Sequence, residues 1–497
     1  MNFRIVWRTV GNVLLIEAGL MLLPVLTALI CHESPVPFLI PLAVTALWYH
    51  ESPVPFLIPM AATALVGFLL SRVKAGRGVF TAREGFVIVG LSWILMSLFA
   101  AVPFVLAHDI PNYLDAVFET VSGLTTTGAS ILPDVEAVSR AGQFWRLFSH
   151  WIGGMGILVF IMAVLPLAGD RSMHIMRAEV PGPVVGKVVP KARQTARILY
   201  LIYLGLTIAE TVLLLCGGMS FYEALLHSFA TAGTGGFSTR ALSIGAFNSV
   251  YIETVVATFM LLFGVNLSLY FLVLVGSWKD AAKNEELKWY LGIVLFAVVT
   301  ITANLAHVYG GVGQALRYAY FQVATIISTT GFSTADFAQW PHYSQTMLVL
   351  LMFVGGCAGS TGGGMKVSRV AILIKDAITE LRRMLRPRSV VQVRLEGKTV
   401  QPGTLRAVQG FFSMYILLLL LGTLAVSLDG AEFTTSFTAT LACLSNIGPG
   451  LGPVGPMGGF GFFSPGVKIV LIFEMLLGRL ELYPILLLFF PATWRAK

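Results

Sequence analysis

Long apolar runs dominate the chain, and short polar or glycine-containing segments separate them. A membrane-spanning helix requires about 20 mainly apolar residues, a length that these runs reach or approach. The predicted spans are residues 10–30, 53–71, 85–107, 143–167, 195–216, 250–276, 288–309, 346–374, 404–428 and 466–491. The pattern predicts an all-α polytopic membrane protein whose length is taken up by spans and short loops.

A longer pattern recurs four times after residue 83: an apolar span, a short amphipathic segment, a glycine-containing break and a second apolar span. The short segments have helical spacing but are too short to cross a bilayer. They are residues 115–125, 221–232, 312–328 and 433–445. We expect four re-entrant half-helices that enter from outside, so that their partly negative C-termini point toward the membrane interior.

The expected organisation is an N-terminal two-helix hairpin followed by four pseudo-symmetric helix–pore-loop–helix repeats. The hairpin, residues 1–83, contains a tandem duplication in which residues 32–49 are nearly copied by residues 50–67. The predicted repeats are 84–194, 195–287, 288–403 and 404–497, and the third contains an intramembrane loop.

The four breaks share a widely spaced set of glycines that lie 108, 95 and 117 residues apart. Non-helical backbone within hydrocarbon is tolerated only where it is buried in protein or lines a watery path. Glycine permits φ > 0, so successive carbonyls can turn toward one axis and replace the hydration shell of a cation. The breaks therefore predict a selectivity filter. Its candidate ion-binding residues are Thr126, Thr127, Gly128, Gly235, Gly236, Phe237, Thr330, Gly331, Phe332, Asn446, Ile447 and Gly448. Only the glycine layer is common to all four loops, which suggests looser ion binding than in a fourfold potassium channel.

A glycine-rich segment interrupts the predicted span 346–374. It differs from a phosphate-binding P-loop in its spacing, no Ser or Thr follows its lysine, and no soluble βα unit surrounds it. We interpret it as an irregular loop below the filter that acts as a gate; the alternative is a simple kinked helix. The candidate gating residues are Gly355, Gly356, Gly359, Gly362, Gly363, Gly364, Lys366 and Arg479.

Arg479 lies within the last predicted span, where a charge is costly and normally faces a cavity or a partner. Glu474 and Glu481 flank it and could compensate its charge. A fixed cation below the filter would instead act as an electrostatic barrier that shapes conduction. Both interpretations remain open from the sequence.

The distribution of charged residues predicts how the chain is oriented in the membrane. The chain is 56% hydrophobic and 12% charged, with a mean hydropathy of +0.81 and a formal net charge of +8. Of its 33 Lys and Arg residues, 26 fall on one side of the predicted membrane. The positive-inside rule makes that side, and both termini, cytoplasmic. The basic excess thus reflects topology, and no nucleic-acid partner is expected.

Other function classes are less well supported. An intramembrane enzyme would need convergent nucleophile and base residues, but His150, His227 and His307 show no such spacing. A proton- or sodium-coupled symporter would need carboxylates at a midplane site. Glu17, Glu210 and Glu474 are single and unpaired in the sequence, so symport remains a weaker alternative to a cation pore.

These motifs closely resemble the Trk/Ktr/HKT superfamily of potassium transporters, and specifically its TrkH/TrkG-type membrane subunits. The resemblance covers nearly the whole chain after the first hairpin, in family order. The motifs that show the resemblance are TTTGAS at 125–130, WIGGMGILVF at 151–160, RAEVPGP at 177–183, TGGFST at 234–239, TTGFST at 329–334, GGCAGSTGGGMKVSR at 355–369, SNIGPGLGPVGP at 445–456 and LGRLELYP at 477–484.

The resemblance implies gated potassium uptake across the bacterial inner membrane, without a bound cofactor. K⁺ would bind at Thr127, Gly128, Gly236, Thr330, Gly331, Ile447 and Gly448. It also implies a homodimer and a cytosolic TrkA-type ring whose nucleotide-binding domains control opening. Within the family, glycine at the position of Gly128 accompanies potassium preference and serine accompanies sodium preference. Na⁺ or mixed Na⁺/K⁺ conduction is the alternative.

Overall fold

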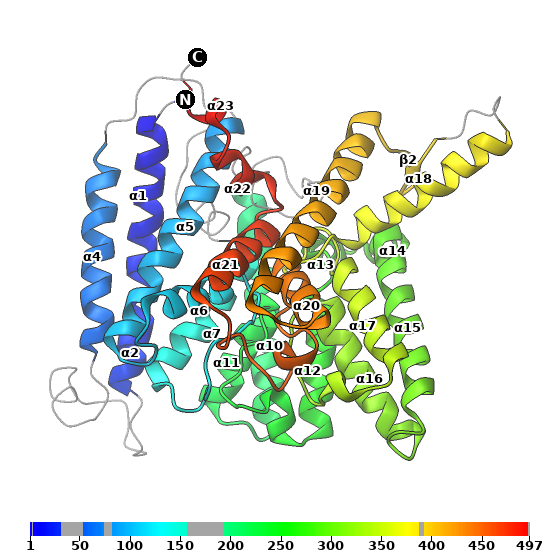
Figure 1. Ribbon diagram of the computed structural model, residues 1–497, viewed down its shortest axis with the longest axis horizontal. Helices are drawn as coiled ribbons and strands as arrows, with labels where there is room; N and C mark the ends of the chain where they lie inside the picture. Colours follow the sequence, from blue (N-terminus) through cyan, green and yellow to red (C-terminus); the bar gives the residue numbers. More distant parts are fainter. Residues whose placement is uncertain (2, 31–52, 74–81, 157–191, 387–391, 496–497) are drawn as a thin grey trace.

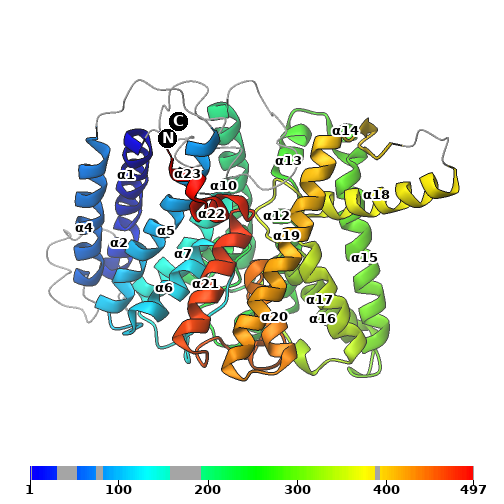
Figure 2. The same cartoon turned by 45° about the horizontal axis from the view of Figure 1, so that its top comes forward.

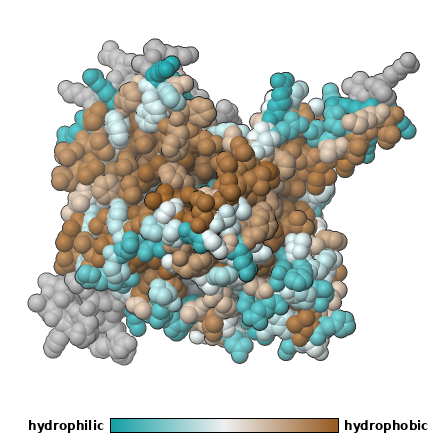
Figure 3. Space-filling view, viewed as in Figure 1, coloured by the Kyte–Doolittle hydropathy of each residue, from teal (hydrophilic) through white to brown (hydrophobic). Residues whose placement is uncertain are grey.

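Helices form almost all of the regular structure. The computed structural model describes residues 1, 3–30, 53–73, 82–156, 192–386 and 392–495. A broad apolar band crosses the middle of the molecule between two hydrophilic ends (Figure 3). Six helices in the described part are long and apolar enough to cross a membrane: Phe3–Ile30, Val54–Ser71, Arg83–Leu106, Gln194–Cys216, Glu285–Leu305 and Pro402–Asp429. A bent helix pair counts as a seventh. The predicted all-α polytopic fold is confirmed.

The N-terminal hairpin stands at one side of the molecule (Figure 1). It consists of α1 (Phe3–Leu20), α2 (Leu22–Ile30) and α4 (Val54–Ser71). An added Cβ on Gly11 of α1 would lie 2.7 Å from the carbonyl oxygen of Gly67 on α4, so the two backbones approach closely. Small residues permit such packing in membranes. The first copy of the duplication, residues 32–49, lies outside the described residues.

Each repeat begins with a long helix and continues with a half-helix. The long helices are α5 (Ala82–Leu106), α10 (Ala192–Cys216), α15 (Glu285–Leu305) and α19 (Pro402–Val426). The half-helices are α6 (Tyr113–Leu124), α11 (Phe221–Gly233), α16 (Val312–Ile327) and α20 (Phe433–Leu444). Their bounds lie within two residues of the predicted segments.

The second helix of each repeat is short. These helices are α7 (Arg140–Met155), α12 (Val250–Phe263), α17 (His342–Val354) and α21 (Pro465–Arg479). Three of them begin at a serine whose side chain accepts a backbone N–H in the first turn, a favourable N-cap: Ser139, Ser249 and Ser464.

The uninterrupted spans predicted at 250–276 and 466–491 are wrong. α12 and α13 (Leu267–Leu274) meet at a bend of 92°. α21 ends at Arg479, and the next helix, α22 (Tyr483–Leu488), follows two residues with positive φ, Glu481 and Leu482. Tertiary contacts satisfy the interrupted backbone: the carbonyl of Gly264 accepts the N–H of Cys357 at 2.9 Å. The predicted span 143–167 extends past α7 into residues outside the described part.

Helix α18 (Val367–Leu385) projects from the body of the molecule (Figures 1 and 2). It continues eleven residues beyond the predicted end of its span at Ile374. A small antiparallel hairpin of β1 (Arg394–Leu395) and β2 (Lys398–Thr399) then leads to α19 and is a minor departure from an all-α chain. The remaining short elements are α14 (Trp278–Lys283), α23 (Pro491–Trp494), η1 (Ser243–Phe247), η2 (Phe337–Gln339), η3 (Ser427–Asp429) and η4 (Gly452–Val454).

The two ends of the chain lie at the same end of the molecule (Figure 1). The rings of Phe3 and Trp494 stack with their centroids 6.3 Å apart. The location of both termini on the cytoplasmic side stays a prediction from the charge distribution.

Candidate ion pathway

All four half-helices end in the same hydrogen-bonded turn. In each, the N–H of the residue directly before the filter glycine donates to the carbonyl five residues earlier, as in the longer bond of a Schellman motif. The bonds are Thr127 to Ser122, Gly235 to Ala230, Thr330 to Thr325 and Ile447 to Ala442, at 2.8 to 2.9 Å. Because the turns are equivalent, the four loops leave their helices in the same way.

The backbone beyond these turns also repeats. Each loop has positive φ at the filter glycine and at the residue two positions before it. The pairs are Thr126 and Gly128, Thr234 and Gly236, Thr329 and Gly331, and Asn446 and Gly448. A left-handed conformation is strained for threonine, so its recurrence indicates that the surrounding structure imposes it.

The four loops close into a ring. Each filter glycine faces a carbonyl oxygen of the next loop: Gly128 faces Gly235, Gly236 faces Thr330, Gly331 faces Ile447, and Gly448 faces Thr127. At Gly448 an added Cβ would lie 2.7 Å from the carbonyl oxygen of Thr127, and at the other three positions it would lie closer still. Four carbonyl oxygens and four glycines thus alternate around one closed layer.

A hollow of about 100 Å³ lies against the ring and is lined by all four glycines. Arg146 and Arg240 also line it, but each is paired. Arg146 contacts Glu119 at 2.6 Å, and Arg240 contacts Glu223 at 2.7 Å. These carboxylates neutralise the arginines, so neither arginine brings an unopposed positive charge to the hollow.

The phenyl rings of the two filter phenylalanines pack into the protein. The Phe237 ring lies against the guanidinium of Arg146, 3.6 Å from its centroid, and against the ring of His150. Nε2 of His150 accepts the N–H of Phe237, and Nδ1 lies 2.8 Å from the carbonyl of Gly123, which defines a neutral tautomer. Phe332 is fully buried beside His227. These side chains support the loops, and any contribution to an ion comes from their backbone.

The glycine-rich segment between α17 and α18 lies directly against the C-terminal ends of two half-helices. The N–H of Gly363 donates to Oγ1 of Thr329 at 2.6 Å, and the N–H of Gly364 donates to the carbonyl of Ser445 at 3.0 Å. Lys366 does not extend into an open path, because its Nζ donates back to Gly362 within the same loop. An irregular loop, rather than a kinked helix, therefore occupies the space beneath the ring.

Arg479 connects this loop to the first repeat. Its guanidinium donates to the carbonyl of Thr361 at 2.8 Å and to the carbonyl of Gly154 at 2.6 Å, and it also reaches the carbonyl of Gly153. Glu481, one of the two carboxylates expected to compensate it, pairs with Arg369 instead. The side chain is only 7% exposed, so its charge lies within the protein beneath the ring.

Residues 52–495 match the family model TrkH, described as cation transport protein. The chain belongs to the TrkH family. It is 38% identical to the Trk system potassium uptake protein TrkH of Salmonella typhimurium and 37% identical to that of Escherichia coli K12, with all of both chains covered in each comparison. Its fold is similar to the crystal structure of the potassium transporter TrkH from Vibrio parahaemolyticus, with a TM-score of 0.86, 34% identity and full coverage of both chains.

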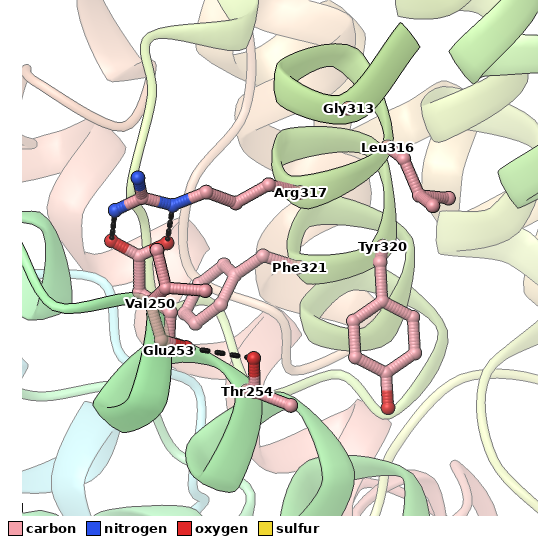
Figure 4. Close-up of a pocket in the computed structure, with 8 residues that line it drawn as sticks. All are labelled: Val250, Glu253, Thr254, Gly313, Leu316, Arg317, Tyr320 and Phe321. Carbon is pink, nitrogen blue, oxygen red and sulfur yellow. Dashed lines mark hydrogen bonds and ion pairs between the residues drawn. The ribbon is translucent and has the colours of Figure 1, made fainter.

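In this TrkH-family chain, ion pairs between repeats were not evident from the sequence. Arg317 on α16 forms a two-pronged pair with Glu253 on α12, with contacts of 2.6 and 2.7 Å (Figure 4). Lys468 on α21 contacts Asp115 on α6 at 2.6 Å. Each pair joins the second helix of one repeat to the half-helix of the next. Partners 64 and 353 residues apart cannot be matched from spacing alone.

Arg317→Gln should lower the free energy of unfolding by about 1–3 kcal/mol, because it leaves the buried carboxylate of Glu253 without its charged partner. Thermal unfolding of the purified protein measures this change. The double variant with Glu253→Gln should recover part of the loss, since it also removes the unpaired charge. Strictly additive losses would contradict a direct interaction.

Proposed function

We propose that this protein is the membrane subunit of a bacterial potassium-uptake system, and that K⁺ passes through the ring of filter loops. The observation that carries the proposal is the closed alternation of four carbonyl oxygens and four glycines at the C-termini of four half-helices. Such oxygens can replace an ion's hydration shell, and helix C-termini favour a cation. The proposed K⁺ sites are Thr127, Gly128, Gly236, Thr330, Gly331, Ile447 and Gly448.

The choice of ion rests on the relatives, which are named potassium uptake proteins. The presence of Gly128, rather than serine, supports the same choice. An inside-negative membrane potential contributes about 2.3 kcal/mol per charge per 100 mV, so K⁺ can accumulate through an open pathway without ATP chemistry. The loop from Gly355 to Lys366 acts as the gate, and Arg479 adds an electrostatic barrier beneath the filter.

We further propose that the protein lies in the inner membrane with both termini in the cytoplasm, works as a homodimer and docks a TrkA-type nucleotide-binding ring. The projecting helix α18 supports a second copy, because a row of large apolar side chains on it is exposed. The residues of this row are Ile374, Ile378, Leu381, Met384 and Leu385. Rows of this kind on a protruding helix are typical of interaction surfaces.

Uptake of ⁸⁶Rb⁺ in cells that lack their own potassium uptake tests the proposal, with the chain expressed together with a TrkA-type partner. We expect Rb⁺ uptake that excess Na⁺ barely inhibits. Na⁺ entry without Rb⁺ flux would overturn the ion assignment. Uptake that collapses with the proton gradient at constant membrane potential would indicate symport instead of a gated pore.

A further inference from the structure

A buried carboxylate outside the filter joins the two ends of the intramembrane loop. Glu286 lies in the first turn of α15 and is 6% exposed. Its Oε1 accepts the N–H of Ala358 at 2.7 Å and the N–H of Ser368 at 3.0 Å. These two residues precede and follow the segment 359–367, which contains the three consecutive glycines Gly362–Gly364. One oxygen atom therefore holds both ends of this segment.

The charge of Glu286 suits this position. Ser368 is the second residue of α18, where backbone N–H groups have no partner within the helix and the helix dipole favours an anion. Hydrogen bonds to a charged group are roughly twice as strong as those between neutral groups. A carboxylate here holds the loop more firmly than a neutral side chain of the same shape.

The other contacts on this side of the loop come mainly from the backbone. The N–H of Cys357 donates to the carbonyl of Gly264, and the N–H of Leu267 donates to the carbonyl of Gly359 at 3.1 Å. Gly264 lies in the break between α12 and α13, and Leu267 is the first residue of α13. Substitution cannot remove such bonds, whereas the contact made by Glu286 depends on one side chain. That side chain is carried by a long helix rather than by the loop itself.

We propose that Glu286 is a positioning residue that holds the intramembrane loop in its closed position beneath the filter. The proposal rests on the proposed function, since it assumes that the loop restricts ion flow. Loss of the carboxylate releases Ala358 and the start of α18 together, so the glycine-rich segment between them is free to move away from the half-helix ends. Glu286 acts through the loop and does not itself contact the ion.

Rb⁺ flux into liposomes that contain the purified full-length chain tests the proposal. Glu286→Ala should raise the flux about tenfold over the wild-type chain. Glu286→Gln, which keeps an acceptor oxygen but loses the charge, should lie between the two. Inhibition by excess Na⁺ should stay at the wild-type level, because the filter is unaltered. Unchanged or lower flux, or a leak that no longer distinguishes Na⁺ from Rb⁺, would overturn the proposal.

A native thiol reports on the loop independently of ion flow. Cys357 adjoins Ala358 in the loop and is 1% exposed. In a chain whose other three cysteines are replaced by serine, a charged water-soluble thiol reagent should label Cys357 about tenfold faster after Glu286→Ala. Wild-type labelling rates in that variant would contradict release of the loop. This readout remains valid even if the variant is less stable, provided that it is monodisperse.

Glu285→Ala is the matched control. Glu285 is adjacent on α15, but its carboxylate contacts Lys375 and the N–H of Glu396 at the cytoplasmic surface rather than the loop. It should leave flux and labelling close to wild type. If Arg479→Ala and the complex with a TrkA-type partner also carry no Rb⁺, the proposed function itself fails. If the Arg479→Ala variant or the complex carries Rb⁺ while the Glu286→Ala variant shows no increase in flux, only the role proposed for Glu286 is wrong.

Discussion

Arg479→Ala is expected to raise the Rb⁺ flux through the protein about tenfold or more. The guanidinium lies beneath the filter and contacts carbonyls of the first repeat and of the intramembrane loop. In the proposed pathway, its removal takes away a fixed positive charge that opposes a permeating cation, and it also removes the hydrogen bonds that link the loop to the last span. A tenfold change corresponds to only about 1.4 kcal/mol, less than a charge at this depth can contribute. Rb⁺ flux into liposomes measures the effect.

Arg479→Lys separates the two contributions. Lysine keeps the charge but cannot reproduce the several directed hydrogen bonds of the guanidinium. If the barrier is electrostatic, the lysine variant stays near wild type; if the link to the loop dominates, its flux approaches that of the alanine variant. Deletion of one glycine from Gly362–Gly364 should also raise flux by displacing the loop. Reduced flux in both the alanine and the deletion variants, at normal protein levels, would refute the gate.

Gly128→Ser is expected to reduce the selectivity for Rb⁺ over Na⁺ about tenfold or more. The new Cβ would overlap the carbonyl oxygen of Gly235, and the left-handed backbone at φ 79° is itself unfavourable for serine. The carbonyl of Gly235 must therefore move, and selectivity depends on where such carbonyls lie. Competition between ⁸⁶Rb⁺ and Na⁺ in the same uptake assay measures the loss.

Two further glycine variants make this prediction specific. Gly448→Ser should have a smaller effect, because its Cβ would lie 2.7 Å from the carbonyl oxygen of Thr127 and so overlaps less. Gly430→Ser is the control for backbone strain, since Gly430 also has positive φ, 74°, but has open space around its Cα. Equal loss of selectivity in the Gly430 variant would show that strain alone, and not displacement of a filter carbonyl, explains the result.

The sequence predicted the half-helices closely because their signals are local. Amphipathic spacing, an apolar flank and a Thr- or Asn-containing end at a glycine are all features of one short stretch of sequence, and the four occurrences reinforce each other. The second helices were predicted less well. In the sequence, α12 and α13 form one apolar run, but in the structure they meet at a bend of 92°. The hydrogen bonds that satisfy the bend come from Cys357 and Gly359 in another repeat, so the local sequence does not reveal it.

The sequence by itself determined the membrane class and located the four half-helices and the irregular loop between α17 and α18, since hydrophobic length and glycine-containing breaks are properties of the local sequence. The orientation in the membrane and the assignment of filter and gating residues stay predictions. Only the tertiary structure decided which carbonyl faces each filter glycine, that Glu481 pairs with Arg369 rather than with Arg479, and that Glu286 holds the ends of the loop. The physical reason is distance along the chain: Ala358 and Glu286 are 72 residues apart, and only packing of the folded helices brings them into contact.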